Sequence, residues 1–146
     1  MLDSLAQLEN FTHGEAATDE ALTEFEEFFG GPLPALYREF LQKYGCAVWF
    51  GAQLYGTGAG LPRFDAVAAT NAARESYIES SFKPLPEKGC VVTRYDGGGW
   101  YWLFPEGNEF PNAVQLFETS QFGSAVESWT TFEEYLKYWI SISTGA

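Results

Sequence analysis

The sequence predicts an α+β domain in which helices pack against one antiparallel β-sheet. Two amphipathic helical patterns come first, runs of β-branched and aromatic residues separated by short turns follow, and a further helical pattern closes the chain. Strands joined by short turns pair antiparallel, and helices then cover the apolar face of such a sheet. With 146 residues, 46% of them hydrophobic, we expect a single domain with one dense core.

The first helices are predicted by the spacing of their apolar residues. Leu2, Leu5 and Leu8 recur every three residues and allow a short helix near the start. A long helix follows, with Thr18 as a suitable N-cap and the Gly30-Gly31 pair as its end. Its apolar and polar residues fall on opposite faces: Ala21, Leu22, Phe25, Phe28 and Phe29 on one, and Asp19, Glu20, Thr23, Glu24, Glu26 and Glu27 on the other.

Two further helices are expected before the main sheet. Pro34 suits the first turn of the next helix and Gly45 ends it. Its buried face should hold Leu36, Tyr37, Phe40, Leu41 and Tyr44. Another helix is expected from about Asp65, where alanines and Asn71 form a weak stripe.

Apolar runs predict the strands. Residues 46–56 indicate a strand pair that turns at Gly51, and further strands are expected at 90–95, 100–104 and 112–119. The glycines that follow Asp96 most simply turn the chain between two of these strands.

The last helix should begin at Thr130. Glu133 lies three residues on and would complete a capping box. Glu133 and Lys137 are spaced for an ion pair on the helix surface.

Few residues are suited to catalysis. His13 is the only histidine and lies in a polar segment, so we expect a solvated side chain rather than a nucleophilic or metal site. The glycines of residues 56–60 lack the spacing and the lysine of a phosphate-binding loop. Cys46 and Cys90 have apolar neighbours and are expected to be buried thiols, with a disulfide between them left open. Paired carboxylates also remain open as a catalytic device.

The net charge of the chain limits the kinds of partner that it is expected to bind. Twenty acidic residues against eight basic ones give a net charge of −12. Nucleic acids and anionic membranes are bound through Lys and Arg, so we expect neither as a partner. The acidic surface serves either solubility or attraction to a positively charged protein. Neither a signal peptide nor an apolar stretch of membrane-spanning length is apparent, so we expect a cytoplasmic protein.

Residues 25–45, FEEFFGGPLPALYREFLQKYG, resemble the signature of the SUKH superfamily, the Smi/Knr-like domain. The matching positions are Phe25, Gly30, Leu33, Pro34, Tyr37, Phe40, Leu41, Tyr44 and Gly45. The segments at 54–56, 96–103 and 127–140 are also similar to family features, although the frequent Asn-Gly after the second helix is Tyr-Gly here. The resemblance covers about residues 18–140. We therefore expect a single SUKH-like domain over 1–146, with an N-terminal extension at 1–17.

The resemblance implies an antiparallel α+β fold and a binding function. Many bacterial members look like immunity proteins that bind and neutralise a cognate toxin domain, often a nuclease, while others are fungal cell-wall regulators or parts of viral proteins. No common catalytic residues are known in the family. The expectation is a non-enzymatic monomer or weak dimer that needs neither cofactor nor metal and binds a basic toxin domain.

Partner contacts are expected near the turns of the sheet, because recognition residues concentrate in loops. The candidates are Asp96, Glu106, Glu109, Glu118, Trp100 and Trp102. Packing in the core is the alternative for the two tryptophans, and solvation is the alternative for the helix acids Glu20, Glu24 and Glu27.

Two other functions stay open at this point. One is a regulatory adaptor module that has no toxin partner. The other is a carboxylate-based hydrolase, which a deep pocket holding two carboxyls with raised pKa values would favour. A flat acidic patch would favour the binding protein.

Overall fold

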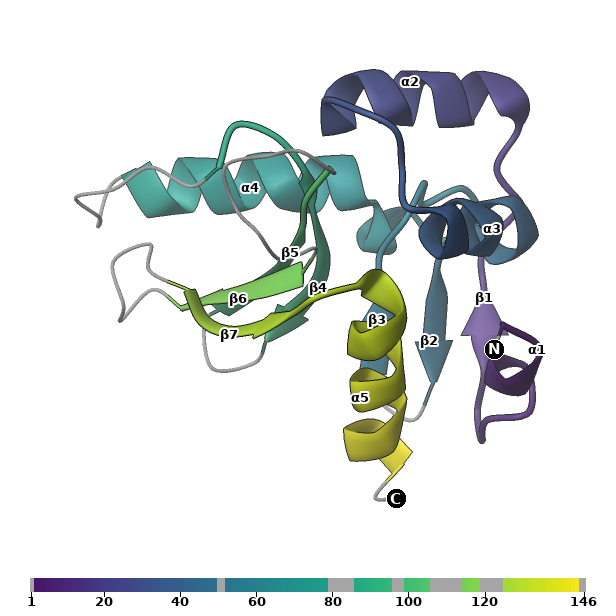
Figure 1. Cartoon of the computed structure of the whole chain (residues 1–146). Helices are drawn as coiled ribbons and strands as arrows, with labels where there is room; N and C mark the ends of the chain where they lie inside the picture. The colour runs from purple at the N-terminus through teal and green to yellow at the C-terminus, as the bar shows by residue number, and fades with distance from the viewer. Residues whose placement is uncertain are drawn as a thin grey trace.

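The computed structural model of the chain has two antiparallel sheets with helices around them (Figure 1). It describes residues 2–49, 52–78, 86–95, 99–105, 114–118 and 125–144. Within these ranges the architecture is an α+β fold, as the sequence predicted, but it has two antiparallel sheets where the sequence predicted one.

The first sheet has three strands in the order β1-β2-β3. They are β1 (Thr12–His13), β2 (Ala47–Trp49) and β3 (Ala52–Leu54), each antiparallel to its neighbour. The predicted strand pair at 46–56 is thus confirmed as β2 and β3. Strand β1 was not predicted, because two residues are too few for a periodic pattern; it adds part of the predicted N-terminal extension to this sheet.

The second sheet has four strands in sequential order. They are β4 (Cys90–Tyr95), β5 (Gly99–Leu103), β6 (Val114–Glu118) and β7 (Ala125–Trp129). The sequence predicted β4, β5 and β6 but not β7. The register shifts between Val91 and Thr93 in β4, which indicates a β-bulge there.

The helices follow the predicted order. They are α1 (Leu2–Leu5), α2 (Asp19–Phe29), α3 (Ala35–Tyr44), the short 3-10 helix η1 (Pro62–Phe64), α4 (Ala66–Ile78) and α5 (Phe132–Thr144). The hydroxyl of Thr18 accepts the backbone N–H of Ala21 at 3.1 Å, as expected of the N-cap of α2. Gly30 ends α2 in a left-handed conformation with φ of 89°.

The cap of α5 lies one residue later than predicted. The hydroxyl of Thr131, not Thr130, accepts the backbone N–H of Glu134 at 3.1 Å. The Glu134 carboxylate accepts the N–H of Thr130 at 3.2 Å, the role that was assigned to Glu133. Glu133 instead forms the predicted surface ion pair with Lys137 at 3.3 Å.

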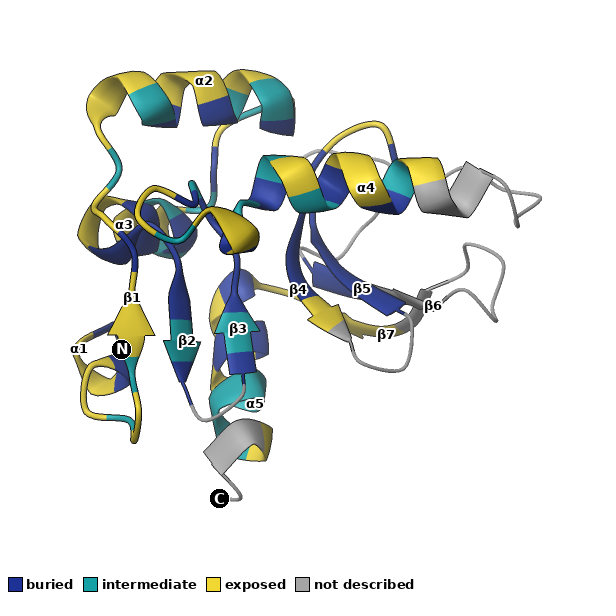
Figure 2. Cartoon of the chain, turned by 180° about the vertical axis from the view of Figure 1, so that it is seen from behind, coloured by how far each residue is buried: buried dark blue, intermediate teal, exposed yellow. Residues whose placement is uncertain are grey.

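Helices cover both faces of the four-stranded sheet. Helix α4 lies against one face, and α5 lies against the other at the opposite end of the molecule from α2 (Figures 1 and 2). On the α5 side, the ring of Tyr101 has its centroid 5.2 Å from that of Tyr135 and 5.4 Å from that of Trp139. Both faces of β5 are therefore buried, and all five of its residues are buried.

Helix α5 also ties the two sheets together. The Tyr135 hydroxyl donates to Thr93 Oγ1 at 2.6 Å, and this hydroxyl in turn donates to the Gln53 carbonyl at 3.1 Å. The indole N–H of Trp139 donates to the same carbonyl at 3.2 Å. A backbone bond from Tyr55 N–H to the Val92 carbonyl, 2.8 Å long, completes the joint between β3 and β4.

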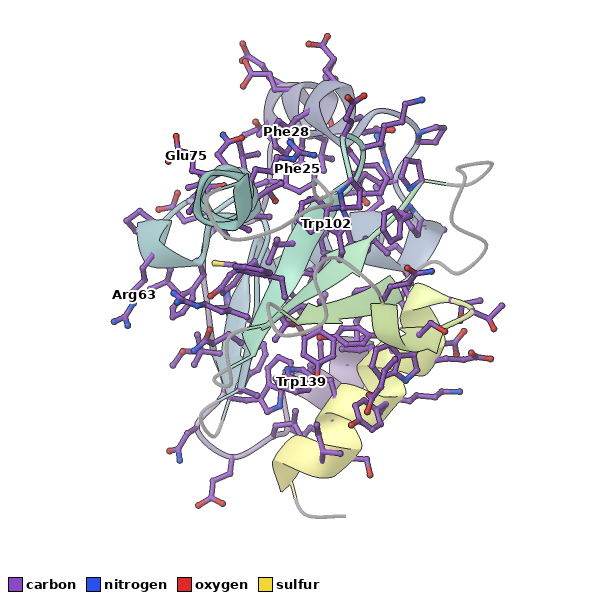
Figure 3. All side chains as sticks on the ribbon, turned by 90° about the vertical axis from the view of Figure 1, so that its left-hand side faces the viewer. Phe25, Phe28, Arg63, Glu75, Trp102 and Trp139 are labelled. Carbon is purple, nitrogen blue, oxygen red and sulfur yellow. The ribbon has the colours of Figure 1, made fainter. Side chains whose placement is uncertain are left out.

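A partly buried arginine joins α2, α4 and β5. The guanidinium carbon of Arg74 lies 5.6 Å from the ring centroid of Phe28 and 5.3 Å from that of Trp102. Its nitrogens donate to the Pro86 carbonyl at 3.1 and 2.8 Å and to the Glu87 carbonyl at 2.8 Å. In Figure 3, Phe28 lies on the side of α2 that faces α4, and Trp102 lies on the sheet beside α4. We call this group of contacts the Arg74 clamp.

Replacing Arg74 with methionine should destabilise the fold clearly. Arg74→Met keeps most of the aliphatic contact but leaves the Pro86 and Glu87 carbonyls without their donor, so the free energy of unfolding should fall by about 2 to 3 kcal/mol. Urea unfolding followed by tryptophan fluorescence measures the loss.

Arg63→Met is the matched control for this measurement. Arg63 is exposed and stacks on one ring, Phe64, at 5.3 Å, so its loss should cost no more than about 1 kcal/mol. Equal losses in the two variants would contradict the importance of the clamp.

Candidate functional site

Helix α2 presents a row of carboxylates to solvent. Its exposed acids are Asp19, Glu20, Glu24 and Glu27. The opposite face is held down by the buried side chains of Leu22, Phe25 and Phe29. Figure 2 shows this division, with the outer side of α2 exposed and the side toward α3 buried. We call the four exposed acids the acidic face of α2.

Glu26 does not belong to that face, although the sequence placed it there. Its carboxylate accepts the backbone N–H of Leu33 at 3.3 Å and forms an ion pair with Arg38. Glu26 therefore stabilises the turn between α2 and α3 and pairs with Arg38, the one arginine of α3. In the described part of the chain, no ion pair engages the four carboxylates of the acidic face.

A pocket of about 400 Å³ lies between α4 and the four-stranded sheet. The helix contributes four small side chains, Ala68, Ala69, Ala72 and Ala73. Val91 and Trp100 line it from the sheet, and Tyr55 and Pro62 line it from the segment that connects the two sheets. Its charged lining residues are Arg63, Asp65 and Arg94. We call it the α4 pocket.

Asp65 holds the N-terminus of α4. Its Oδ1 accepts the backbone N–H of Val67 at 3.2 Å. Burial raises the pKa of Asp65, and hydrogen bonds from the backbone of Val67 and Ala68 offset only part of this effect. Asp65 is the one carboxyl among the described residues that line the α4 pocket, so the pair of raised carboxyls that would favour a hydrolase is not seen there.

A second hollow lies between α1 and α3. It measures about 560 Å³ and is lined by Leu2, Asp3, Leu36, Glu39, Gln42 and Lys43. Within it Lys43 forms an ion pair with Asp3. This pairing lowers the pKa of Asp3 and raises that of Lys43. Lys43, the one cation among the described residues that line the hollow, is therefore already paired.

The residues most suited to nucleophilic chemistry are His13 and the two cysteines, and each of them is packed against other parts of the fold. His13 lies in β1, with its ring centroid 5.1 Å from that of Tyr44, and its Nδ1 lies 2.6 Å from the Gly14 carbonyl oxygen. Cys46 and Cys90 are both buried, as the sequence predicted, and both are free thiols. Burial raises the pKa of each thiol, which disfavours the reactive thiolate. Within the described ranges, no three His, Cys, Asp or Glu side chains lie together so that they could hold a metal ion.

Gly56, in the glycine segment 56–60, allows two backbone segments to pack closely. A Cβ atom at Gly56 would lie 1.8 Å from the carbonyl oxygen of Gly45. Close backbone approach, not ligand binding, accounts for this glycine.

The structure describes the side chains of two of the six predicted contact residues, Trp100 and Trp102. Trp102 is fully buried, and its indole N–H donates to the Lys88 carbonyl at 2.9 Å; Trp100 is 8% exposed and lines the α4 pocket. The positions of both agree with the packing alternative, while a role in partner binding stays a prediction. Asp96, Glu106 and Glu109 lie outside the described residues, as does the side chain of Glu118 in β6.

Sequence reasoning missed the α4 pocket. Its arginines are 31 positions apart, at 63 and 94, and only tertiary packing brings them to one cavity. The available signal was weak. It consisted of one basic residue before an alanine-rich helix and one after it, in a chain that has only eight basic residues.

Fold and surface together define a small α+β domain of antiparallel sheets with one strongly acidic helix face. The chain matches the model of the SMI1 / KNR4 family (SUKH-1) over residues 16–138 and belongs to this family. The matched range runs from just before α2 into α5. No curated protein gives a match to the chain. None of the described helices has the length and apolar character that crossing a membrane requires.

The pKa of Asp65 predicts a pH-dependent effect of neutralising it. Because burial raises this pKa, the ionised carboxylate destabilises the folded state above the ordinary Asp range, and the penalty fades as the pH falls toward 4. Asp65→Asn keeps the acceptor for Val67. It should therefore be more stable than the unmodified chain at pH 7 and lose this advantage near pH 4, as measured by urea unfolding at both values.

Asp3→Asn is a control of opposite sign. Lys43 lowers the pKa of Asp3, so ionised Asp3 stabilises the fold at pH 7 and this contribution disappears as the pH falls through the lowered pKa. Asp3→Asn should thus be slightly less stable at pH 7. A stability difference for Asp65→Asn that does not change with pH would refute the assignment.

Proposed function

We propose that the chain is an immunity protein that binds a basic toxin domain, such as a nuclease, and covers the surface that the toxin uses to hold nucleic acid. The acidic face of α2, unpaired within the described residues and set in a chain of net charge −12, is the observation that carries this proposal. Membership of the SUKH family supports it, because immunity proteins are the bacterial function that the resemblance implied.

The geometry of the acidic face suits such a role. Glu20, Glu24 and Glu27 follow the i, i+4, i+7 spacing of one helix face, so the Cβ atoms of successive members lie about 5 to 6 Å apart. A single nucleic-acid strand carries a charge about every 3.4 Å. Both are rows of closely spaced negative charges, so a basic groove that binds phosphates can also attract this row of carboxylates.

The acidic face also has a rigid support. The inner side of α2 is buried, Glu26 fixes the following turn, and Phe28 stacks on the guanidinium of the Arg74 clamp. A preorganised surface loses little conformational entropy when a partner binds. Long-range attraction to a basic partner would raise the association rate.

A regulatory adaptor could use the same surface for a different basic protein. The product of the neighbouring gene distinguishes the two functions, because an immunity protein is expected beside its toxin. A carboxylate-based hydrolase has no comparable support, since the α4 pocket shows one described carboxyl.

Binding to the toxin domain encoded beside the gene tests the proposal. The dissociation constant should rise at least tenfold between about 50 mM and about 500 mM salt, because screening weakens charge attraction at exposed surfaces. The triple variant Glu20→Gln, Glu24→Gln, Glu27→Gln should weaken binding at low salt by about 30-fold, or about 2 kcal/mol, from three rim charges.

Two further triple variants make the comparison specific. Glu9→Gln, Glu39→Gln, Glu127→Gln removes three exposed acids elsewhere, so it matches the change in net charge and should have a much smaller effect. Asp96→Asn, Glu106→Gln, Glu109→Gln tests the predicted contacts at the sheet turns. Failure of the chain to bind the adjacent toxin domain would sink the proposal, and equal effects of the α2 triple and the control triple would remove the acidic face as its basis.

A further inference from the structure

We propose that the α4 pocket is a second recognition site, which receives a carboxylate side chain of the protein partner together with a neighbouring apolar side chain. This inference rests on the proposed function for the existence of a protein partner. It adds the chemistry of one segment of that partner and a site distinct from the acidic face of α2.

Two arginines give the pocket its preference for a carboxylate. Arg63 and Arg94 are both exposed, and both line it. Four other basic residues are satisfied elsewhere: Arg38, Lys43 and Lys137 in ion pairs, and Arg74 by carbonyls. No described carboxylate pairs with Arg63 or Arg94. Guanidinium groups bind carboxylates through paired hydrogen bonds, so two of them at one cavity favour an anionic group there.

The remaining walls favour an apolar side chain. The four alanines of α4 leave space that longer side chains would fill, and Val91 and Trp100 close the cavity from the sheet. A volume of about 400 Å³ is in the range of sites that enclose a small ligand or a few side-chain groups. Figure 3, which looks along α4, shows Glu75 above the helix and Arg63 below it, so the acid of α4 lies away from the arginine side.

Asp65 argues for a peptide rather than a free anion. It is partly buried in the pocket, and burial raises its pKa because solvation of its charge is incomplete. A peptide brings backbone N–H donors to Asp65 along with a carboxylate for the arginines. A phosphate or other small anion brings no backbone N–H donors of this kind.

The net charge of the chain also favours a peptide over a free anion. A free dianion is repelled by a molecule of charge −12. A carboxylate carried by a basic partner is brought to the pocket by the attraction between the two proteins as wholes. The pocket would then fix the register of the complex, since a carboxylate in any other position meets an acidic surface.

Chemical-shift titration of the full ¹⁵N-labelled chain tests the pocket without the toxin. The probes are N-acetyl-Leu-Glu-Leu-amide, the matched N-acetyl-Leu-Gln-Leu-amide, adenosine monophosphate and inorganic phosphate. We expect the Glu peptide to shift the amides of residues 68–73 and of Val91 and Arg94. We expect it to bind at least fivefold more tightly than the Gln peptide, and both to bind more tightly than the two phosphate probes.

Variants assign the effect to the pocket. Arg63→Gln and Arg94→Gln should each weaken Glu-peptide binding about fivefold, the equivalent of about 1 kcal/mol, while Lys88→Gln should leave it unchanged. Ala72→Leu places a larger side chain at an exposed position of α4 and should reduce binding of both peptides without unfolding the protein.

The outcomes separate this inference from the proposed function. Equal affinity for the two peptides, tighter binding of either phosphate probe, or the absence of shifts around the pocket would each overturn it. A toxin domain that still binds through α2 in a salt-dependent manner would show that only the pocket had failed. A positive titration together with no toxin binding would overturn the proposed function alone.

Discussion

The hydrogen-bonded stack around the guanidinium of Arg74 is the constraint on which the rest of the structure depends. A partly buried cation is costly unless its donors are satisfied, and here two carbonyls and two aromatic rings surround it. Phe28 belongs to α2, Trp102 to β5, and the carbonyls to the segment before β4. The clamp therefore sets where the acidic face stands relative to the sheet.

Helix α4, which carries Arg74, is also held to the sheet by a buried threonine. Thr70 Oγ1 accepts the backbone N–H of Val91 at 2.8 Å and donates to the Ala66 carbonyl at 2.6 Å. This N–H belongs to a residue at the bulge of β4, where the ladder with β5 changes register. Because polar contacts fix the helix at this distance, its alanines leave the α4 pocket open beside them.

Much of this fold could be predicted from the sequence, and the reasons differ from element to element. Helix α2 combines an apolar face with caps at both ends, and α3 combines an apolar face with Pro34 before it and Gly45 after it, so several local signals agree. The cap of α5 was misplaced by one residue because Thr130-Thr131 and Glu133-Glu134 offer two equally spaced pairs. Period-two alternation places Trp100 and Trp102 on one face of β5, but it could not show that helices cover both faces of this strand. The pocket arginines meet only through tertiary packing.

A titration of the adjacent toxin domain with this protein tests the central claim most directly, namely that the chain acts by occupying a surface and not by turnover. The measurement is the toxin's rate of nucleic-acid cleavage as a function of the molar ratio of the two proteins. The account predicts a linear loss of activity that ends at one chain per toxin domain, with full recovery when high salt separates them. Complete inactivation by a small fraction of an equivalent, persisting after separation, would contradict it.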